Sequence, residues 1–143
     1  MSTYSFQEVE ATFSHPSLGV ISTNGLGMGS VSVNMATDRA TATTAADGTV
    51  VINKIKDRHG NVSIDIQQTS DVHKDFKRWW NYLESADASE FAKIKVVVTS
   101  KSTKEQDICT GVAMVKQPDN TKEAEVGNAN WNFLAADIQQ NIV

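Results

Sequence analysis

Three histidines and one cysteine are the side chains of this sequence best suited to metal or nucleophilic chemistry. His15, His59 and His73 lie far apart and form neither an H-x-H nor an H-E-x-x-H pair, the spacings that bring two imidazoles to one metal ion. Cys109 lies within an alternating apolar run, where a cysteine usually packs as a small hydrophobic residue. No histidine stands close to it in sequence to activate a thiolate. We therefore expect three surface histidines, a buried cysteine and no metal site.

Glycines at positions 25, 27 and 29, within NGLGMGSV, have a superficial likeness to a dinucleotide-binding loop. That loop requires the spacing G-x-G-x-x-G between a strand and a helix, whereas here the spacing is G-x-G-x-G and a strand-like run follows. The sequence contains no GK[ST] phosphate loop, and its carboxylates are scattered without an evident catalytic pair. We therefore predict no catalytic residue and no cofactor, and we expect a protein that is not an enzyme.

Composition narrows the class of protein further. The chain has 143 residues and a net charge of −4, from 17 acidic and 13 basic side chains, which argues against a nucleic-acid-binding surface. A single cysteine excludes an internal disulfide and fits a reducing compartment. The first residues do not resemble a secretory signal, and no apolar run approaches the roughly 20 residues of a membrane span. We expect one domain over residues 1–143, made and kept in the cytosol, with no membrane anchor.

Apolar residues recur mostly with period two, which is typical of half-buried β-strands. Two runs place Val31, Val33 and Met35, and then Val62, Ile64 and Ile66, on one face, with polar residues between them. A third places Ala129, Trp131 and Phe133 inward. In the run 107–115, Ile108, Val112 and Met114 are expected to face one way and Cys109, Ala113 and Val115 the other. The strands are predicted within residues 4–13, 31–36, 61–69, 93–100, 107–115 and 125–135.

One segment follows a helical period instead. Ser70 and Asp71 form a good N-cap pair, and the residues after them predict a helix over residues 72–85. We interpret its apolar stripe as core that packs flat on a sheet. The predicted fold is mainly β (α+β), an antiparallel β-sandwich or partly rolled barrel with one packed helix. The stripe consists of Val72, Phe76, Trp79, Trp80 and Leu83.

The stretch DRATATTAADGTVVINK, residues 38–54, predicts a hairpin that turns at Asp47 and Gly48. Small and β-branched residues flank the turn, so neither arm supplies enough large apolar groups to build a core of its own. A neighbouring copy of the same protein could supply the missing contacts, and the same holds for the run 107–115. The residues that we expect in this contact are Asp38, Arg39, Thr41, Thr43, Thr44, Ala46, Asp47, Gly48, Val50 and Ile52.

Three blocks of the sequence resemble tail tube proteins of contractile-tailed bacteriophages. The first is the opening MSTYSFQEVEATF, and the second is VSVNMATDRATATTAADGTVVINKIKDRHGNVSIDIQQTS, with its ADG turn followed by a strand ending in Q-T-S. The third, DICTGVAMVKQPDNTKEAEVGNANWNFLAADI, has a Pro-Asp turn, an acidic Glu-x-Gly stretch and an aromatic x-W-x-F strand. The blocks occur in the order of that family and together span nearly the whole chain.

The resemblance implies a fold related to type VI secretion tube proteins and hexameric rings that stack into a hollow tube. Each subunit would contribute strands to an inter-subunit β-barrel, with the residue 38–54 hairpin against a neighbouring subunit, in the adjacent ring. The implied partners are other copies of the chain, the tail sheath, the tape-measure protein, the baseplate and the tail terminator. DNA would pass through the lumen without specific binding. The implied location is the virion tail, assembled in the host bacterial cytoplasm.

Two further considerations concern function. Six copies at −4 each would give a ring a net charge of −24, and acidic residues facing the lumen would repel DNA phosphates. The tube of a phage-derived contractile bacteriocin is the first alternative. A monomeric β-sandwich binding module is the second, with Trp79, Trp80 and Trp131 as its candidate aromatic platform. Self-association distinguishes a tube from such a module.

Overall fold

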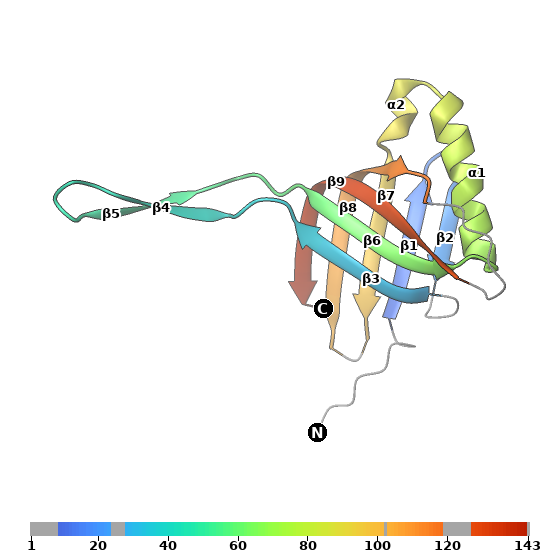
Figure 1. Ribbon diagram of the computed structural model, residues 1–143, viewed down its shortest axis with the longest axis horizontal. Helices are drawn as coiled ribbons and strands as arrows, with labels where there is room; N and C mark the ends of the chain where they lie inside the picture. Colours follow the sequence, from blue (N-terminus) through green and yellow to red (C-terminus); the bar gives the residue numbers. More distant parts are fainter. Residues whose placement is uncertain (1–8, 24–27, 102, 119–126, 143) are drawn as a thin grey trace.

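A single curled sheet forms the body of the protein. The computed structural model describes residues 9–23, 28–101, 103–118 and 127–142, and over these residues seven strands form an antiparallel sheet in the order β2-β1-β7-β8-β9-β6-β3. The sheet curls into a half-barrel, with a helix packed beside it (Figure 1). The sheet strands are β1 Val9–His15, β2 Gly19–Thr23, β3 Met28–Met35, β6 Gly60–Gln67, β7 Ile94–Ser100, β8 Glu105–Lys116 and β9 Asn128–Ile142.

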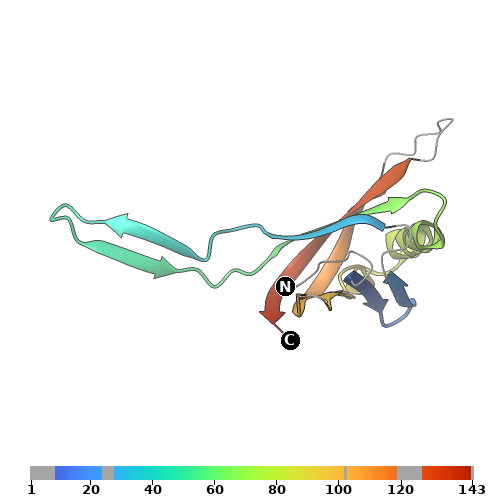
Figure 2. The same cartoon turned by 90° about the horizontal axis from the view of Figure 1, so that it is seen from below.

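The remaining elements are a separate two-stranded ribbon and two helices. The ribbon consists of β4 Ala40–Thr44 and β5 Val50–Lys54, inserted between β3 and β6, and it extends far from the body of the molecule (Figures 1 and 2). The helices are α1 Asp71–Ser85 and α2 Ala88–Phe91. The mainly β class with one principal helix is therefore confirmed, and the barrel is a partly rolled one.

The period-two pattern correctly predicted which strand residues form the core. Val62, Ile64 and Ile66 of β6 are buried, as are the inward residues of β9. Four aromatic rings from three different elements meet at the centre, and the Phe13 ring lies 4.8 Å from that of Phe76 and 5.2 Å from that of Phe133. Such closely packed rings contribute more than their buried area alone. The buried β9 residues are Ala129, Trp131 and Phe133.

Helix α1 begins where its cap predicts. The Ser70 side chain accepts a hydrogen bond from the His73 backbone N–H, at 3.3 Å, and so satisfies one of the free N–H groups of the first turn. Of the predicted apolar stripe, Phe76, Trp79 and Leu83 are buried, whereas Val72 and Trp80 are half-buried against the core. The helix therefore fixes one side of the half-barrel.

A bulge in β8 overturns the predicted faces of residues 107–115. Cys109 and Val112 are both buried, although an uninterrupted strand would place them on opposite faces. The pairing between β7 and β8 shifts by one residue at this point, and Gly111 has a φ of +61°, which glycine adopts without strain. The extra residue of the bulge changes the side of the sheet to which the following side chains point, so Cys109 packs in the core together with Val112 and Met114. The buried position of Cys109 itself was predicted correctly.

Two histidines expected at the surface are buried, which makes that prediction wrong for His15 and His73; His59 is exposed. His15 continues the alternation of β1, and His73 lies one turn before Phe76 on the buried side of α1. Burial of a polar ring is tolerated where it has hydrogen-bond partners. The Trp131 Nε1–H donates to His73 Nδ1 at 3.0 Å, and His15 bonds to the chain at both ring nitrogens.

The sequence pattern did not indicate β2 or α2. Strand β2 buries only Ile21 and Thr23, and α2 is a single turn, so neither leaves a periodic signal long enough to detect. The predicted opening strand corresponds to β1, which runs on to His15. Its first five positions, 4–8, lie outside the described residues, as do Gly25, Gly27 and most of the predicted acidic stretch before β9.

Candidate assembly interface

The ribbon predicted around Asp47 and Gly48 is a true hairpin. Ala45 and Thr49 pair across the turn through the Ala45 N–H and the Thr49 carbonyl at 2.8 Å, and the Gly48 N–H donates to the Ala45 carbonyl at 2.9 Å. Gly48 has a φ of +89°, a conformation that suits glycine in three-residue hairpin loops. The Asp47 carboxylate accepts from the Thr49 N–H, and this bond and one to the Thr49 side chain lower its pKa.

Every residue of β4 and β5 is exposed, including Val50, Val51 and Ile52, which are 57%, 53% and 75% exposed. Cross-strand pairing places Val50 and Ile52 opposite Thr44 and Ala42 on one side of the ribbon. We call this side the apolar hairpin face; it consists of Ala40, Ala42, Thr44, Val50 and Ile52 and ends at Lys54. Nothing in the described part of the chain covers it. An aliphatic surface of this kind is typical of a binding site.

The root of the hairpin is anchored to the sheet. The Arg58 guanidinium lies 2.6 Å from the Asp137 carboxylate, and the Ile138 N–H donates to the Arg58 carbonyl at 2.9 Å. A Cβ at Gly60 would lie 2.1 Å from the Asn34 carbonyl oxygen and 2.6 Å from Ile138 Cδ1, so only glycine fits here. These contacts set the direction in which the hairpin leaves the body.

Four strands form a smaller unit with two open edges. The pairing of β7 with β8 reaches only to Val112, so within the described ranges residues 113–116 of β8 pair with β9 alone. At the other side, β3 has β6 as its sole strand neighbour among the described residues. We call the unit of residues 112–116, the first half of β9, β6 and β3 the open-edged sheet. Unpaired strand edges present free backbone groups that readily pair with another chain.

The side of the open-edged sheet that faces away from the core is lined mainly with amides and hydroxyls, and it also carries Lys116, opposite Asn132, and the exposed Leu134, opposite Asn61. Direct cross-strand pairs such as Ser32 with Ser63 and Asp65 with Asn130 place these groups on one surface. Asp65 accepts hydrogen bonds from Ser30 Oγ and Asn130 Nδ2. Besides Asp65, the open-edged sheet contains one charged residue, Lys116. We call this surface the polar face; it consists of Ser30, Ser32, Asn34, Asn61, Ser63, Asp65, Asn128, Asn130 and Asn132.

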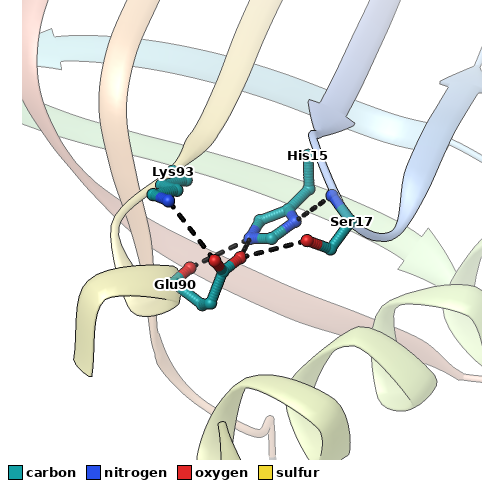
Figure 3. A network of polar contacts seen from close by, with 4 residues as sticks. All are labelled: His15, Ser17, Glu90 and Lys93. Carbon is teal, nitrogen blue, oxygen red and sulfur yellow. Dashed lines mark hydrogen bonds and ion pairs between the residues drawn. The ribbon is translucent and has the colours of Figure 1, made fainter. Parts of the chain in front are cut away.

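One cluster contains the residue types of a catalytic triad. Figure 3 shows His15, Ser17, Glu90 and Lys93 together, where the turn after β1 meets α2. The Ser17 hydroxyl donates to the Glu90 carboxylate at 3.2 Å, whereas only the Ser17 backbone N–H reaches His15, donating to Nδ1 at 3.1 Å. The His15 Nε2–H donates to the Glu90 carbonyl at 2.9 Å. Because the hydroxyl does not bond to the imidazole, the cluster lacks the contact that activates a serine.

The same cluster is well suited to a structural role. The Lys93 ammonium lies 3.3 Å from the Glu90 carboxylate, and this hydrogen bond, followed by that of Ser17, lowers the pKa of Glu90.

Burial, reinforced by Asp107 and Asp137, raises the pKa of the Cys109 thiol to about 12, so it is protonated and unreactive at neutral pH. Among the described residues, no three His, Cys, Asp or Glu side chains gather as a metal site.

The aromatic platform of a binding module is not formed. Trp131 is fully buried and Trp79 is 5% exposed, so neither can contact a ligand at the surface. Trp80 is half-buried against the core.

Within the described ranges, no helix is both long and apolar enough to cross a membrane.

Several solved structures share this fold, among them chains of an extracellular contractile injection system. The chain is similar to a component of the anti-feeding prophage baseplate, with a TM-score of 0.64 and 12% identity over 100% of this chain and 99% of that one. It is also similar to chains from the PVC sheath–tube complex (TM-score 0.58, 10% identity, 93% and 88% covered) and the PVC sheath/tube terminator (0.58, 8%, 92% and 92%), both in the extended state. At these identities the likeness establishes a shared fold.

The sequence itself identifies the family. Residues 1–143 match the family described as Bacteriophage PhiTE tail tube protein, and the chain belongs to that family. No curated protein matches it in sequence. Family membership gives the chain a structural role in a phage tail tube and makes it a component of the virion tail. The resemblance seen in the three sequence blocks is thereby confirmed.

Proposed function

We propose that six copies of the chain form a ring, that the rings stack into a hollow tube inside a contractile sheath, and that the tube conducts DNA during ejection. The observation that carries the proposal is the apolar hairpin face, every residue of which is exposed on a ribbon with no core of its own. A monomer gains nothing from exposing it, whereas a neighbouring ring would bury it.

The open-edged sheet supports closure of the ring. Edge β3 of one copy can pair with residues 113–116 of the next, so that each subunit adds four strands to a continuous barrel. A closed barrel has no free edges, which removes the tendency of an exposed edge to pair with other chains. The family fold and the position of the edges within one sheet favour this arrangement over a linear polymer.

In such a barrel the polar face lines the lumen, because the opposite face of the same strands packs against the core. Each ring then presents six Asp65 carboxylates and six Lys116 ammonium groups, whose formal charges cancel, among amides and hydroxyls. The lumen would therefore carry little of the net −24 of the whole ring. Amides and hydroxyls do not neutralise phosphates, and each Lys116 is offset by one Asp65, so DNA would release few counterions on contact and would gain little affinity. A lumen of this composition lets DNA pass without specific binding.

The remaining partners follow from the same assignment. We propose the sheath, the baseplate and the tail terminator as neighbours of the tube, with the tape-measure protein in its lumen before ejection and assembly in the host bacterial cytoplasm. The fold occurs in a sheath–tube complex, a baseplate and a terminator, which supports the first three. The tube of a contractile bacteriocin is the second candidate, because those solved structures are injection systems.

Negative-stain electron microscopy of the purified chain over a concentration series tests the proposal. We expect rings or tubes with a central channel. A variant that lacks residues 42–51 should keep its fold by circular dichroism, because no buried residue is removed, and should lose the tubes. A wild-type chain that stays monomeric even with its baseplate supplied would refute the tube. Tubes formed by the shortened variant would refute the role of the hairpin.

A further inference from the structure

A hollow of about 190 Å³ opens at the end of the half-barrel where β1 and β8 begin and β7 ends. Its apolar wall consists of Val9 from β1, Val31 from β3 and Val98 from β7, all of them core or core-packed residues. Its polar wall includes Glu105 and Asp107, two positions apart on β8. The hollow thus combines an aliphatic surface with two carboxylates.

The polar wall lacks partners within the described part of the chain. Neither Glu105 nor Asp107 takes part in an ion pair there, and the Ser100 hydroxyl oxygen is buried without a hydrogen-bond partner. Burial, and then the charge of Glu105, raises the pKa of Asp107. Two adjacent carboxylates, one of them partly buried, favour the approach of a cation, which relieves their repulsion.

The apolar hairpin face has the complementary pattern. Val50, Ile52 and Lys54 lie on one side of β5 at alternate positions, so two aliphatic side chains are followed by an ammonium group over about 13 Å. All three are exposed. Lys54 forms no ion pair in the ranges that the structure describes.

The hairpin of the same chain does not occupy the hollow. It leaves the body at Met35 and Gly60 and points away from it in both views (Figures 1 and 2), and the Arg58–Asp137 ion pair anchors its root in that direction. The matching hairpin must therefore come from another molecule.

We propose that the Val9–Val31–Val98 hollow is the receptor for the hairpin of a second copy of this chain, with Val50 and Ile52 on the aliphatic wall and Lys54 between Glu105 and Asp107. The inference rests on the proposed tube and adds to it the site at which one subunit holds the next. In this arrangement the apolar hairpin face, rather than the opposite face of the ribbon, contacts the second copy.

Charge reversal across the contact tests the pairing. Lys54→Glu alone and Glu105→Lys alone should each raise the protein concentration needed for tube formation by about tenfold or more, because each places like charges together. The double variant, Lys54→Glu with Glu105→Lys, should form tubes at a concentration close to that of wild type. Pelleting assays and electron microscopy report the assembled fraction.

The matched control is Lys74→Glu, which reverses an exposed lysine on α1 away from the hollow and should leave assembly unchanged. Two results would overturn the inference: single variants that assemble like wild type, or a double variant that assembles no better than the singles. Both leave the tube itself intact, since wild-type tubes are seen in the same experiment. Absence of wild-type tubes would instead refute the proposed function.

Discussion

Phe76 is the residue of helix α1 that packs against aromatic rings of two sheet strands. Its ring lies 4.8 Å from Phe13, 5.5 Å from Trp131 and 5.6 Å from Phe133, so rings of β1 and β9 meet on it. It is fully buried. Close packing of this kind leaves little freedom for neighbours to relax after truncation.

Phe76→Ala should therefore lower the free energy of unfolding by about 3–5 kcal/mol, through lost burial and the cavity left behind. Lys74→Ala, on the exposed side of the same helix, should change it by less than about 0.5 kcal/mol. Urea unfolding of unassembled protein, followed by tryptophan fluorescence, gives both values. A Phe76→Ala loss no larger than that of Lys74→Ala would contradict the role of Phe76.

Glu90 provides a pH-dependent contact. The hydrogen bond from Lys93 is the main cause that lowers the pKa of Glu90. The Glu90 carboxylate therefore stabilises the folded state at pH values above the ordinary carboxyl pKa, and this stabilisation is lost as the pH falls through the lowered pKa. Lys93→Ala should raise the pKa of Glu90 towards that of an isolated carboxyl, and NMR titration of the Glu90 side chain measures the change. An unchanged titration midpoint would show that Lys93 is not the main cause.

Among the elements, the hairpin depends most on its root. The ribbon has no buried residue, so the Arg58–Asp137 pair and the close approach of Gly60 to Asn34 set its direction. The receptor proposed for the hairpin can be reached only if that direction is kept, since a small rotation at the root becomes a large displacement at the tip.

Gly60→Ala should destabilise the protein by about 1–3 kcal/mol, because its Cβ would overlap the Asn34 carbonyl and the Ile138 side chain. Gly127→Ala is the matched control, since a Cβ there meets no atom within 4 Å. Urea unfolding compares the two, and electron microscopy shows whether tubes still form. Equal stability of both variants would contradict the steric requirement at Gly60.

For the whole molecule, the decisive question is which face of the open-edged sheet lines the lumen. We expect the polar face to do so, with α1 on the opposite side of the sheet. Asn130→Cys should then react in assembled tubes with a small maleimide and resist a maleimide attached to a large polymer. Lys74→Cys on α1 should react with both maleimide reagents. Cys109 should react with neither, because it is buried and protonated. Equal labelling of Asn130→Cys by the polymer reagent would place the polar face outside.

Local order could be predicted from the chain alone. Alternation in β6 and β9, the helical spacing from Phe76 to Leu83, the Ser70 cap and the Asp47–Gly48 turn all depend on residues a few positions apart. Burial of one face of a strand or helix imposes a period that needs no knowledge of the partner. The sequence blocks likewise sufficed to identify the family.

Only the tertiary structure decided the features that depend on distant partners. Burial of the polar His73 ring is tolerated because Trp131, 58 positions away, donates a hydrogen bond to it. Cys109 shares a face with Val112 because β7 and β8 pair across a bulge. The hollow joins β1, β3, β7 and β8, and the open edges follow from strand order. Pairing between strands is set by cooperative packing over the whole sheet, which no short stretch of sequence specifies.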